Sequence, residues 1–364
     1  MSSSSQPLIV LAAYGVRTWK DRPRRHLDIH PVPSEGRAIV DEWFESDDEV
    51  TKHHHLRPRS HASRLVTAFR LIWKNRQPLR DARFIYCLDG MHFSALLMLA
   101  RVGLFKTAGK TIRRYCFHDR AVRRLAPMLK QAPPAFQLEC ITRQQCEIGS
   151  NLLGKGRVVF RRWKIDTEWY QPEGSAQDGA CLLAGNACRD EAMVDGLLAQ
   201  GIAVTRAGRA DALQRRFAAQ LKNPLFKLAL NTSHPDYLRL LRSSCAVLLP
   251  ILPCDEPAGL TAAMEALACE VPILANCSMG IAELFESCRY PLPLIDSLDP
   301  QAWAAAIRDL EAQKTSTTFR EALAASRQRL LDQHSIQPEG HDWFDILGDS
   351  SPAAAPAAAM LQPV

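Results

Sequence analysis

The sequence is notable first for what it lacks. Its 364 residues contain no apolar run of the roughly 18–20 residues that a membrane-spanning helix requires. No basic leader precedes the short apolar run near the N-terminus, so we expect no signal peptide. The eleven cysteines include no Cys-x-x-Cys pair, which favours reduced thiols that serve as small core residues. Together these absences predict a cytoplasmic protein.

The charge is present but unevenly placed. Residues 1–165 contain 30 Lys and Arg and 14 Asp and Glu, a net charge of +16. Residues 166–364 contain the remaining 15 and 25, a net charge of −10. A basic half suggests an anionic partner, namely a phosphorylated substrate, an anionic membrane surface or nucleic acid. A solvated surface with excess arginine is the alternative interpretation.

The first half has the rhythm of βαβ units, in which buried strands alternate with helices. A buried helix is expected over residues 91–103, between two strands. Residues 20–63 are polar and rich in Arg and His, and we expect a long, partly mobile loop there. Its His53–His55 run lacks metal-ligand spacing, so we predict no metal site. Strands are expected at residues 7–15, 81–90, 111–119, 136–143 and 156–164.

A linker is expected over residues 165–179, where Pro, Gly, Ser and Asp follow in quick succession. The same rhythm then restarts, which predicts an α/β fold of two domains, 1–165 and 166–348, with a disordered tail at 349–364. In the second domain a helix is expected at 189–201 and another at 234–244. Strands are expected at residues 180–185, 202–208, 225–230, 245–252 and 271–275.

The stretch "EPAGLTAAMEALACEVP" brackets a short apolar segment with Glu256 and Glu265. A helix that starts near Leu260 or Thr261 would offer free N–H groups to a phosphate, and Gly259 would allow the backbone to approach closely. Glu265 would lie roughly 6 Å along that helix, within reach of an attached ribose. Because its helix is flanked by buried strands, the carboxylate of Glu265 needs a partner. Glu256 would face the other end of the diphosphate, where a sugar would sit.

These residues resemble the nucleotide-sugar motif of the family-four glycosyltransferases, in which two glutamates are separated by seven residues. Two further segments resemble that family, "RRWKIDTEWYQP" at the domain junction and "SHPDYLRLLRSSCAVLLP" before the motif. The resemblance covers residues 160–340 well, whereas the N-terminal half matches only in its rhythm. It implies the GT-B architecture, two Rossmann-like domains that face each other across a cleft.

The sequence departs from the family pattern in three ways. Eight residues, not seven, separate Glu256 from Glu265, so either the loop bulges at Ala258-Gly259 or Glu256 has lost its sugar-binding role. Glu270 stands where a glycine is usual. The family's diphosphate-binding Arg and Lys are not intact in the loop "GNACRDE". Donor-binding residues are therefore expected among Gly185, Asn186 and Arg189 of that loop, with Arg209 as a weaker candidate.

In the N-terminal half the resemblance implies two further residues. Gly15 ends the first expected strand, where the family often has a glycine loop near the phosphates. His118 ends another, where the family often has a histidine that faces the donor sugar, although a structural histidine is equally compatible with the sequence. His118 and Glu256 are the predicted catalytic residues.

The resemblance implies a glycosyltransferase that moves a sugar from a nucleotide-diphosphate-sugar, such as a UDP or GDP sugar, with retention of anomeric configuration. We expect no obligatory metal and no cofactor, because no Asp-x-Asp pair has a convincing context. The expected acceptor is phosphorylated or membrane-associated, with the protein peripheral at the inner membrane face. Two alternatives stay open. One is a polyanion or nucleic-acid binder, which would need aromatic residues clustered among the basic ones, whereas Trp19, Trp73 and Trp163 stand far apart in the sequence. The other is a catalytically weakened GT-B protein that acts as a partner subunit.

Overall fold

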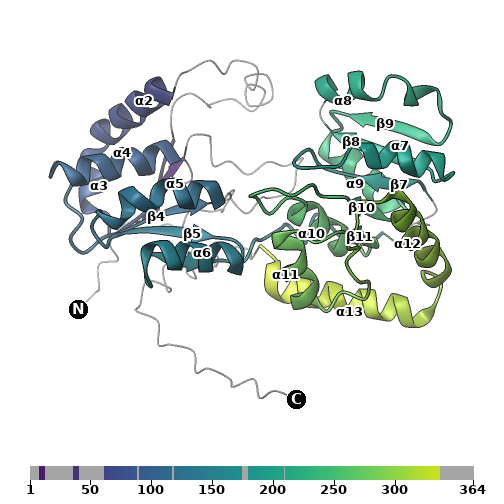
Figure 1. Ribbon diagram of the computed structural model, residues 1–364. Coiled ribbons are helices and arrows are strands. Elements are labelled where there is room, and N and C mark those ends of the chain that lie inside the picture. Colours follow the sequence, from purple (N-terminus) through teal and green to yellow (C-terminus); the bar gives the residue numbers. More distant parts are fainter. Residues whose placement is uncertain are drawn as a thin grey trace.

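The protein consists of two α/β units that lie side by side, one ending at Phe160 and the other beginning at Cys181 (Figure 1). The computed structural model describes residues 8–12, 36–40, 61–87, 90–116, 119–173, 179–208 and 210–336. The expected tail at 349–364 lies outside these residues, as does the part of the expected linker at 174–178. Each unit is built on one parallel sheet, which confirms the predicted fold class.

The N-terminal unit has a six-stranded parallel sheet in the order β2-β1-β3-β4-β5-β6. One face of this sheet packs with its helices into an apolar core. The strands are β1 Leu8–Ala12, β2 Gly36–Val40, β3 Phe84–Cys87, β4 Thr111–Cys116, β5 Phe136–Cys140 and β6 Val158–Phe160. The helices are α2 His61–Lys74, α3 Arg76–Asp81, α4 Gly90–Arg101, α5 Asp119–Lys130 and α6 Arg143–Leu153.

Strand β2 corrects the sequence prediction, because it lies within the segment 20–63 that we expected to be a loop. Its five residues pair in parallel with β1, from Leu8 opposite Gly36 to Ala12 opposite Val40. A short strand between highly charged segments has little sequence pattern from which it could be predicted. Such a strand forms because it pairs with a neighbouring strand, whatever the composition of the surrounding segment.

The C-terminal unit has a five-stranded parallel sheet in the order β11-β10-β7-β8-β9. The strands are β7 Cys181–Leu183, β8 Val204–Gly208, β9 Phe226–Leu230, β10 Val247–Leu249 and β11 Ile273–Ala275. The helices are α7 Ala192–Ala199, α8 Ala210–Arg216, the 3₁₀ helix Gln220–Lys222, α9 His234–Ser243, α10 Leu260–Ala268, α11 Met279–Cys288, α12 Pro300–Gln313 and α13 Thr317–His334. The strand order reverses between β7 and β10, and ligands of such sheets bind beyond the carboxyl ends of strands at this switch point.

Local sequence explains where several helices begin. The side chains of Ser233, Asp299 and Ser316 accept hydrogen bonds from backbone N–H groups of the first turns of α9, α12 and α13. Proline stands at the start of both α9 and α12, where its missing N–H costs nothing. These signals fix the residues at which α9, α12 and α13 begin.

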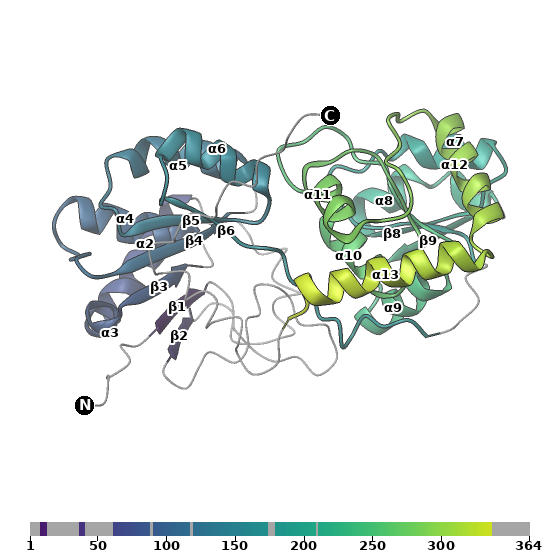
Figure 2. The ribbon, with the colours of Figure 1, turned by 90° about the horizontal axis from the view of Figure 1, so that it is seen from below.

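The chain crosses between the units after β6, and α13 returns to the same place (Figure 2). The backbone N–H of Ile165 donates to the carbonyl of His334 at 2.9 Å, and the N–H of Ile336 donates to the carbonyl of Ile165 at 2.9 Å. Among the described residues, no helix has both the length and the apolar character needed to cross a membrane.

Candidate functional site

Two loops meet at the switch point of the C-terminal sheet. One follows β7 from Ala184 to Glu191, and the other follows β10 from Pro250 to Gly259. They are hydrogen-bonded to each other, from Leu252 N–H to the Cys188 carbonyl at 2.8 Å and from Asp190 N–H to the Pro250 carbonyl at 2.9 Å. The two loops therefore form one rigid edge rather than two independent segments.

A third loop, after β11, is tied to the same edge. The side chain of Asn276 accepts from the N–H of Ile251 at 2.6 Å and donates to the carbonyl of Ile251 at 2.8 Å. The hydroxyl of Ser278, which precedes α11, donates to the carbonyl of Ala258 at 3.1 Å. These contacts hold the starts of α10 and α11 in fixed positions.

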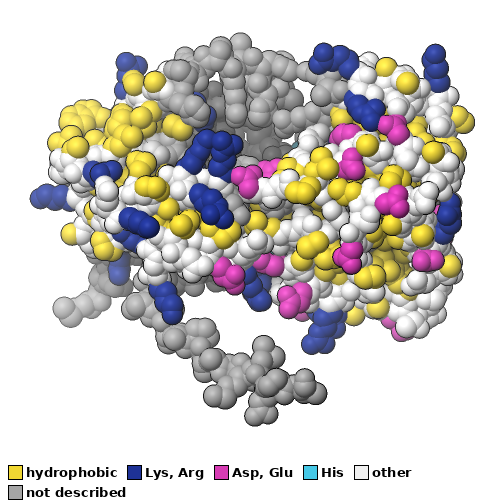
Figure 3. Space-filling view, viewed as in Figure 1, with side chains coloured by type: hydrophobic (Ala, Val, Ile, Leu, Met, Phe, Trp, Pro, Cys, Tyr) yellow, Lys and Arg dark blue, Asp and Glu magenta, His cyan; other side chains and the backbone are white. Residues whose placement is uncertain are grey.

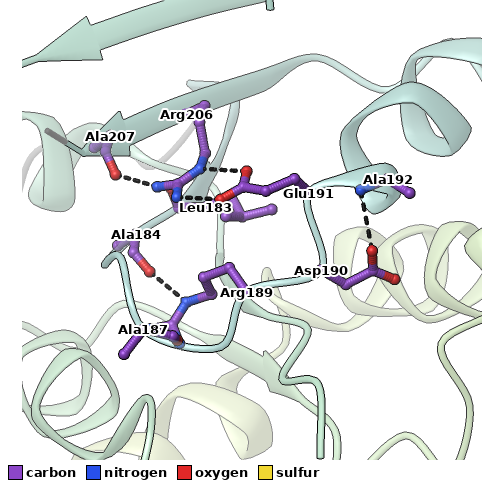
Figure 4. Close-up of polar contacts among 9 residues, drawn as sticks. All are labelled: Leu183, Ala184, Ala187, Arg189, Asp190, Glu191, Ala192, Arg206 and Ala207. Atoms are coloured by element: carbon purple, nitrogen blue, oxygen red, sulfur yellow. Dashed lines mark hydrogen bonds and ion pairs between the residues drawn. The ribbon is translucent and has the colours of Figure 1, made fainter. Parts of the chain in front are cut away.

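Arg189 is buried within the loop after β7 (Figure 4), with an exposed fraction of 6%. Its Nε donates to the carbonyl of Ala184 at 2.6 Å, and Nη1 donates to the carbonyl of Ala187 at 2.8 Å. Among the described residues no carboxylate forms an ion pair with it. Burial, followed by the neighbouring Arg206, lowers the pKa of Arg189 to about 10, which still leaves the guanidinium charged at neutral pH.

Arg189 does not open a helix, contrary to the expected helix at 189–201. Its backbone pairs with Ile251 as an antiparallel bridge, and α7 begins three residues later at Ala192. Pairing with the loop after β10 removes the residue from helical geometry. The side chain is thereby placed behind the switch point and not on the surface.

A second buried arginine, Arg206 on β8, was missed by sequence reasoning. Its Nε and Nη2 donate to the two carboxylate oxygens of Glu191 at 2.8 and 2.6 Å, a paired arrangement that is visible in Figure 4. Two buried guanidinium groups thus lie at this edge, and among the described residues only that of Arg206 is ion-paired with a carboxylate. An anionic ligand would supply the counter-charge that the guanidinium of Arg189 does not receive from a paired carboxylate.

Gly185 and Asn186 begin the same loop. Gly185 has a φ of 88°, and a side chain there would lie 2.6 Å from Nη2 of Arg189. Asn186 is exposed, and its Oδ1 would be 2.7 Å from a Cβ at Gly208, so it lies beside the end of β8. Gly185 therefore lies against Arg189, and Asn186 lies beside the end of the strand that carries Arg206.

Helix α10 begins without a side-chain cap. Gly259 precedes it with a φ of 85°, and a Cβ there would lie 2.9 Å from Ile281, so the position requires glycine. The N–H of Leu260 donates a hydrogen bond to the carbonyl of Pro257. Among the described residues, no acceptor receives a hydrogen bond from the N–H of Thr261 or Ala262. The start of α10 therefore keeps free donors and the positive end of the helix dipole.

Glu265 has the partners that its burial demanded. Tyr170 donates to Oε1 at 2.8 Å and Tyr237 donates to Oε2 at 3.1 Å. Burial, and then Glu265, raise the pKa of each tyrosine well above its ordinary value, so both phenols stay protonated and act as donors. The nearby Arg189 acts in the opposite direction on the pKa of Tyr237, which places Arg189, Tyr237 and Glu265 in one neighbourhood. A carboxylate oxygen that accepts one hydrogen bond can still accept another.

Glu256 is half-buried against the loop after β7. The thiol of Cys188 donates to its Oε1 at 3.3 Å. The N–H of Ala258 donates back to the Glu256 carbonyl at 2.7 Å, which closes a tight turn at the place where we expected the extra residue to be absorbed. The structure thus brings Glu256, Arg189, Gly259, Thr261 and Glu265 to one edge. The remaining predicted site residues, Gly15, His118 and Arg209, lie outside the described residues.

The two units also share a cavity of about 230 Å³. Beside it, the carboxylate of Glu283 on α11 accepts hydrogen bonds from the backbone N–H groups of Arg143 at 2.9 Å and Gln144 at 3.2 Å. Glu283 therefore caps α6 of the other unit. The cavity is lined by Ile141, Thr142, Arg143, Phe160, Arg162 and Trp163 of the N-terminal unit and by Leu260, Gly280, Glu283, Leu284, Glu286, Ser287 and His334.

Solved structures resemble this chain over nearly its whole length. HepE from Anabaena, determined with UDP-glucose, is 13% identical with a TM-score of 0.66 over 94% of this chain and 99% of HepE. Sucrose-phosphate synthase from Thermosynechococcus elongatus is 12% identical with a TM-score of 0.67 over 95% and 99%. A trehalose-6-phosphate synthase, studied for glycosyl transfer with retention, is 14% identical with a TM-score of 0.61 over 96% and 100%.

No family model matches the chain, and no curated protein matches it. At these identities the solved structures establish the fold alone. The chain has the GT-B architecture of the nucleotide-sugar glycosyltransferases, as the resemblance implied.

Proposed function

We propose that the protein is a glycosyltransferase that moves a sugar from a nucleotide-diphosphate-sugar, such as a UDP sugar, to an acceptor. The observation that carries this proposal is Arg189, which is buried at the switch point without a carboxylate partner among the described residues. The charged guanidinium of Arg189 lies at the same edge as the uncapped start of α10 and the buried Arg206. Together these groups form a binding site for the two phosphates of a diphosphate.

Each residue at the edge has a task in this reaction. Arg189 and the N–H groups of Thr261 and Ala262 stabilise the negative charge that falls on the departing diphosphate. Glu265 accepts from the ribose hydroxyls, and Glu256 holds the donor sugar at the other end of the diphosphate. The transition state is oxocarbenium-like, and transfer proceeds with retention, in keeping with the trehalose-6-phosphate synthase that resembles this chain.

The acceptor binds to the basic N-terminal unit and is phosphorylated or membrane-associated, because residues 1–165 have a net charge of +16. We propose that Arg189 and the start of α10 carry the diphosphate charge without a resident metal ion. Turnover should then be unchanged in the presence of a chelator, and loss of turnover that added Mg²⁺ restores would contradict this part of the proposal.

The test of the donor site is Arg189→Gln. Loss of charge-assisted hydrogen bonds should weaken nucleotide-diphosphate binding by about 1.5–3 kcal/mol, roughly 10- to 150-fold, in calorimetry with UDP, GDP and ADP. The control is Arg216→Gln, which removes a surface arginine paired with Asp195 in the same unit. Equal dissociation constants for the wild type and Arg189→Gln would overturn the proposed site.

Glu256 requires a different measurement, because its contact is with the sugar alone. Glu256→Ala should leave binding of the bare nucleotide nearly unchanged and lower turnover of the full donor about 10- to 100-fold, if about 1.4–2.8 kcal/mol of transition-state contact is lost. Wild-type turnover in this variant would remove Glu256 from the donor site.

A further inference from the structure

The most exposed apolar side chains of the described residues lie at one end of the N-terminal unit. Trp73 near the end of α2 is 62% exposed, and Val102 and Leu104, just after α4, are 68% and 62% exposed. Figure 3 shows hydrophobic side chains gathered over α2 and α4. Side chains of this size are rarely left in water together on a soluble protein.

The topology explains why these side chains share one end. Helices α2 and α4 pack side by side, and each leads back to the starting edge of a parallel strand, β3 and β4 respectively. Lys110, at the end of the loop after α4, donates to the carbonyls of Arg80 and Ala82 at the end of α3. The ends of α2 and α4 therefore face away from the carboxyl edge of the sheet.

Basic side chains surround this apolar end. Residues 61–110 contain nine Lys and Arg and two Asp and Glu. The guanidinium of Arg76 lies 5.4 Å from the centre of the Trp73 ring. Arg76, Arg101 and Lys106 are exposed, and none of them forms an ion pair with a carboxylate in the part of the chain that the structure describes.

We propose that this end of the N-terminal unit, formed by Trp73, Val102 and Leu104 with Arg76, Arg101 and Lys106, docks on an anionic lipid surface. Apolar side chains enter the headgroup boundary while the cations meet lipid phosphates, the combination by which peripheral proteins bind membranes. A second copy of the chain is a poor occupant, because a symmetric contact would bring the same positive charges together. The surface is separate from the donor site, so the inference goes beyond the proposed transferase activity.

The test is flotation of the full-length protein with vesicles of phosphatidylcholine alone or with phosphatidylglycerol added. The wild type should bind only the anionic vesicles. The variants Trp73→Ser/Val102→Ser/Leu104→Ser and Arg76→Glu/Lys106→Glu should each bind at least about tenfold more weakly. The matched control is Leu221→Ser/Lys222→Glu in the other unit, where Leu221 is 51% exposed. This control should bind as the wild type does.

A second measurement reports on Trp73 alone. Vesicles whose lipid chains carry bromine should quench part of the fluorescence of the wild type, and Trp73→Phe should bind the vesicles but lose that quenching. Absence of vesicle binding by the wild type, or equal binding by the surface variants, would overturn the proposal. So would surface variants that change only the oligomeric state in light scattering. Nucleotide binding and thermal unfolding should be the same in all variants, which keeps failure of this inference distinct from failure of the proposed activity.

Discussion

At the scale of single residues, Glu265 takes its partners from two distant parts of the chain. Tyr170 belongs to the segment that crosses between the units, and Tyr237 lies on α9. Both hydroxyls fix the carboxylate in one orientation, so Glu265 can meet a ribose without first losing rotamer freedom. We therefore interpret the two tyrosines as positioning residues for the proposed donor site.

Tyr237→Phe keeps the ring and removes one donor. We expect it to weaken nucleotide-diphosphate binding by about 0.5–1.5 kcal/mol, the net contribution of a typical hydrogen bond, in calorimetry. The control is Tyr290→Phe, because Tyr290 is also buried but bonds the backbone of Ile273. If both variants lose stability but bind the nucleotide equally well, Tyr237 has only a structural role.

The same tyrosines predict a pH dependence. Their pKa values are raised above the ordinary value of 10.0, so the folded protein holds these protons more tightly than the unfolded chain does. Their contribution to stability is fully present below pH 10 and is lost as the pH rises through the raised values. Denaturant titrations should show the wild type losing stability above pH 10 more steeply than Tyr170→Phe/Tyr237→Phe. Parallel curves for the two proteins would contradict the assignment.

At this scale the sequence predicted which side chain needs a hydrogen-bond partner, but it did not predict which residues supply the hydrogen bonds. The apolar surroundings of Glu265 indicated that its carboxylate requires a partner, but Tyr170 is 95 residues away and Tyr237 is 28 away. Arg206 was missed for the same reason, since its pairing with Glu191 depends on two elements that meet only in the folded sheet. Side-chain pairing between distant elements leaves no periodic pattern in a single sequence.

At the scale of elements, the start of α6 is completed by the other unit. Glu283 accepts from the first two N–H groups of α6, and the hydroxyl of Thr142 accepts from the third, on Gln145. A carboxylate at a helix N-terminus also interacts favourably with the helix dipole. The contact therefore joins α6 to α11 through backbone groups that any sequence of α6 would offer.

Glu283→Ala should remove this cap at a cost of about 0.5–2 kcal/mol. Because the loss is local, the amide hydrogens of Arg143 and Gln144 should exchange faster with solvent, which hydrogen exchange measures directly. Glu286→Ala, on the same helix and at the same cavity, is the control and should leave those amides protected. Unchanged exchange in Glu283→Ala would mean that the units do not hold this contact in solution.

Helices and strands with a strong apolar pattern could be predicted from the sequence. Elements with a weak pattern, which depend on pairing with a neighbour, could not. Strands such as β10 and β11 were expected at the right places because each is a continuous run of buried apolar residues. Strand β2 was not, because its five residues gain their stability from β1. The helix start near Leu260 could be predicted from the sequence, but the strand order that places the switch point there and the hydrogen bonds that join its loops could not.

At the scale of the whole molecule, the two halves of the chain carry opposite net charge, +16 for residues 1–165 and −10 for 166–364. Their attraction favours an arrangement in which the units lie close together, and it is screened beyond about 10 Å at 0.1 M salt. We expect the radius of gyration from small-angle X-ray scattering to rise between about 0.05 and 0.5 M salt. A constant or falling value would show that long-range charge does not hold the units together.

The seam at Ile165 and Ile336 has a consequence for evolution and engineering. Because the chain leaves the first unit and comes back at one point, the intervening 170 or so residues behave as a cassette with adjacent ends. Grafting such a cassette onto a foreign partner requires rebuilding this pair of backbone hydrogen bonds and the contact of Glu283 with the start of α6. A chimaera cut at this seam would join the donor site that we propose to a different N-terminal unit.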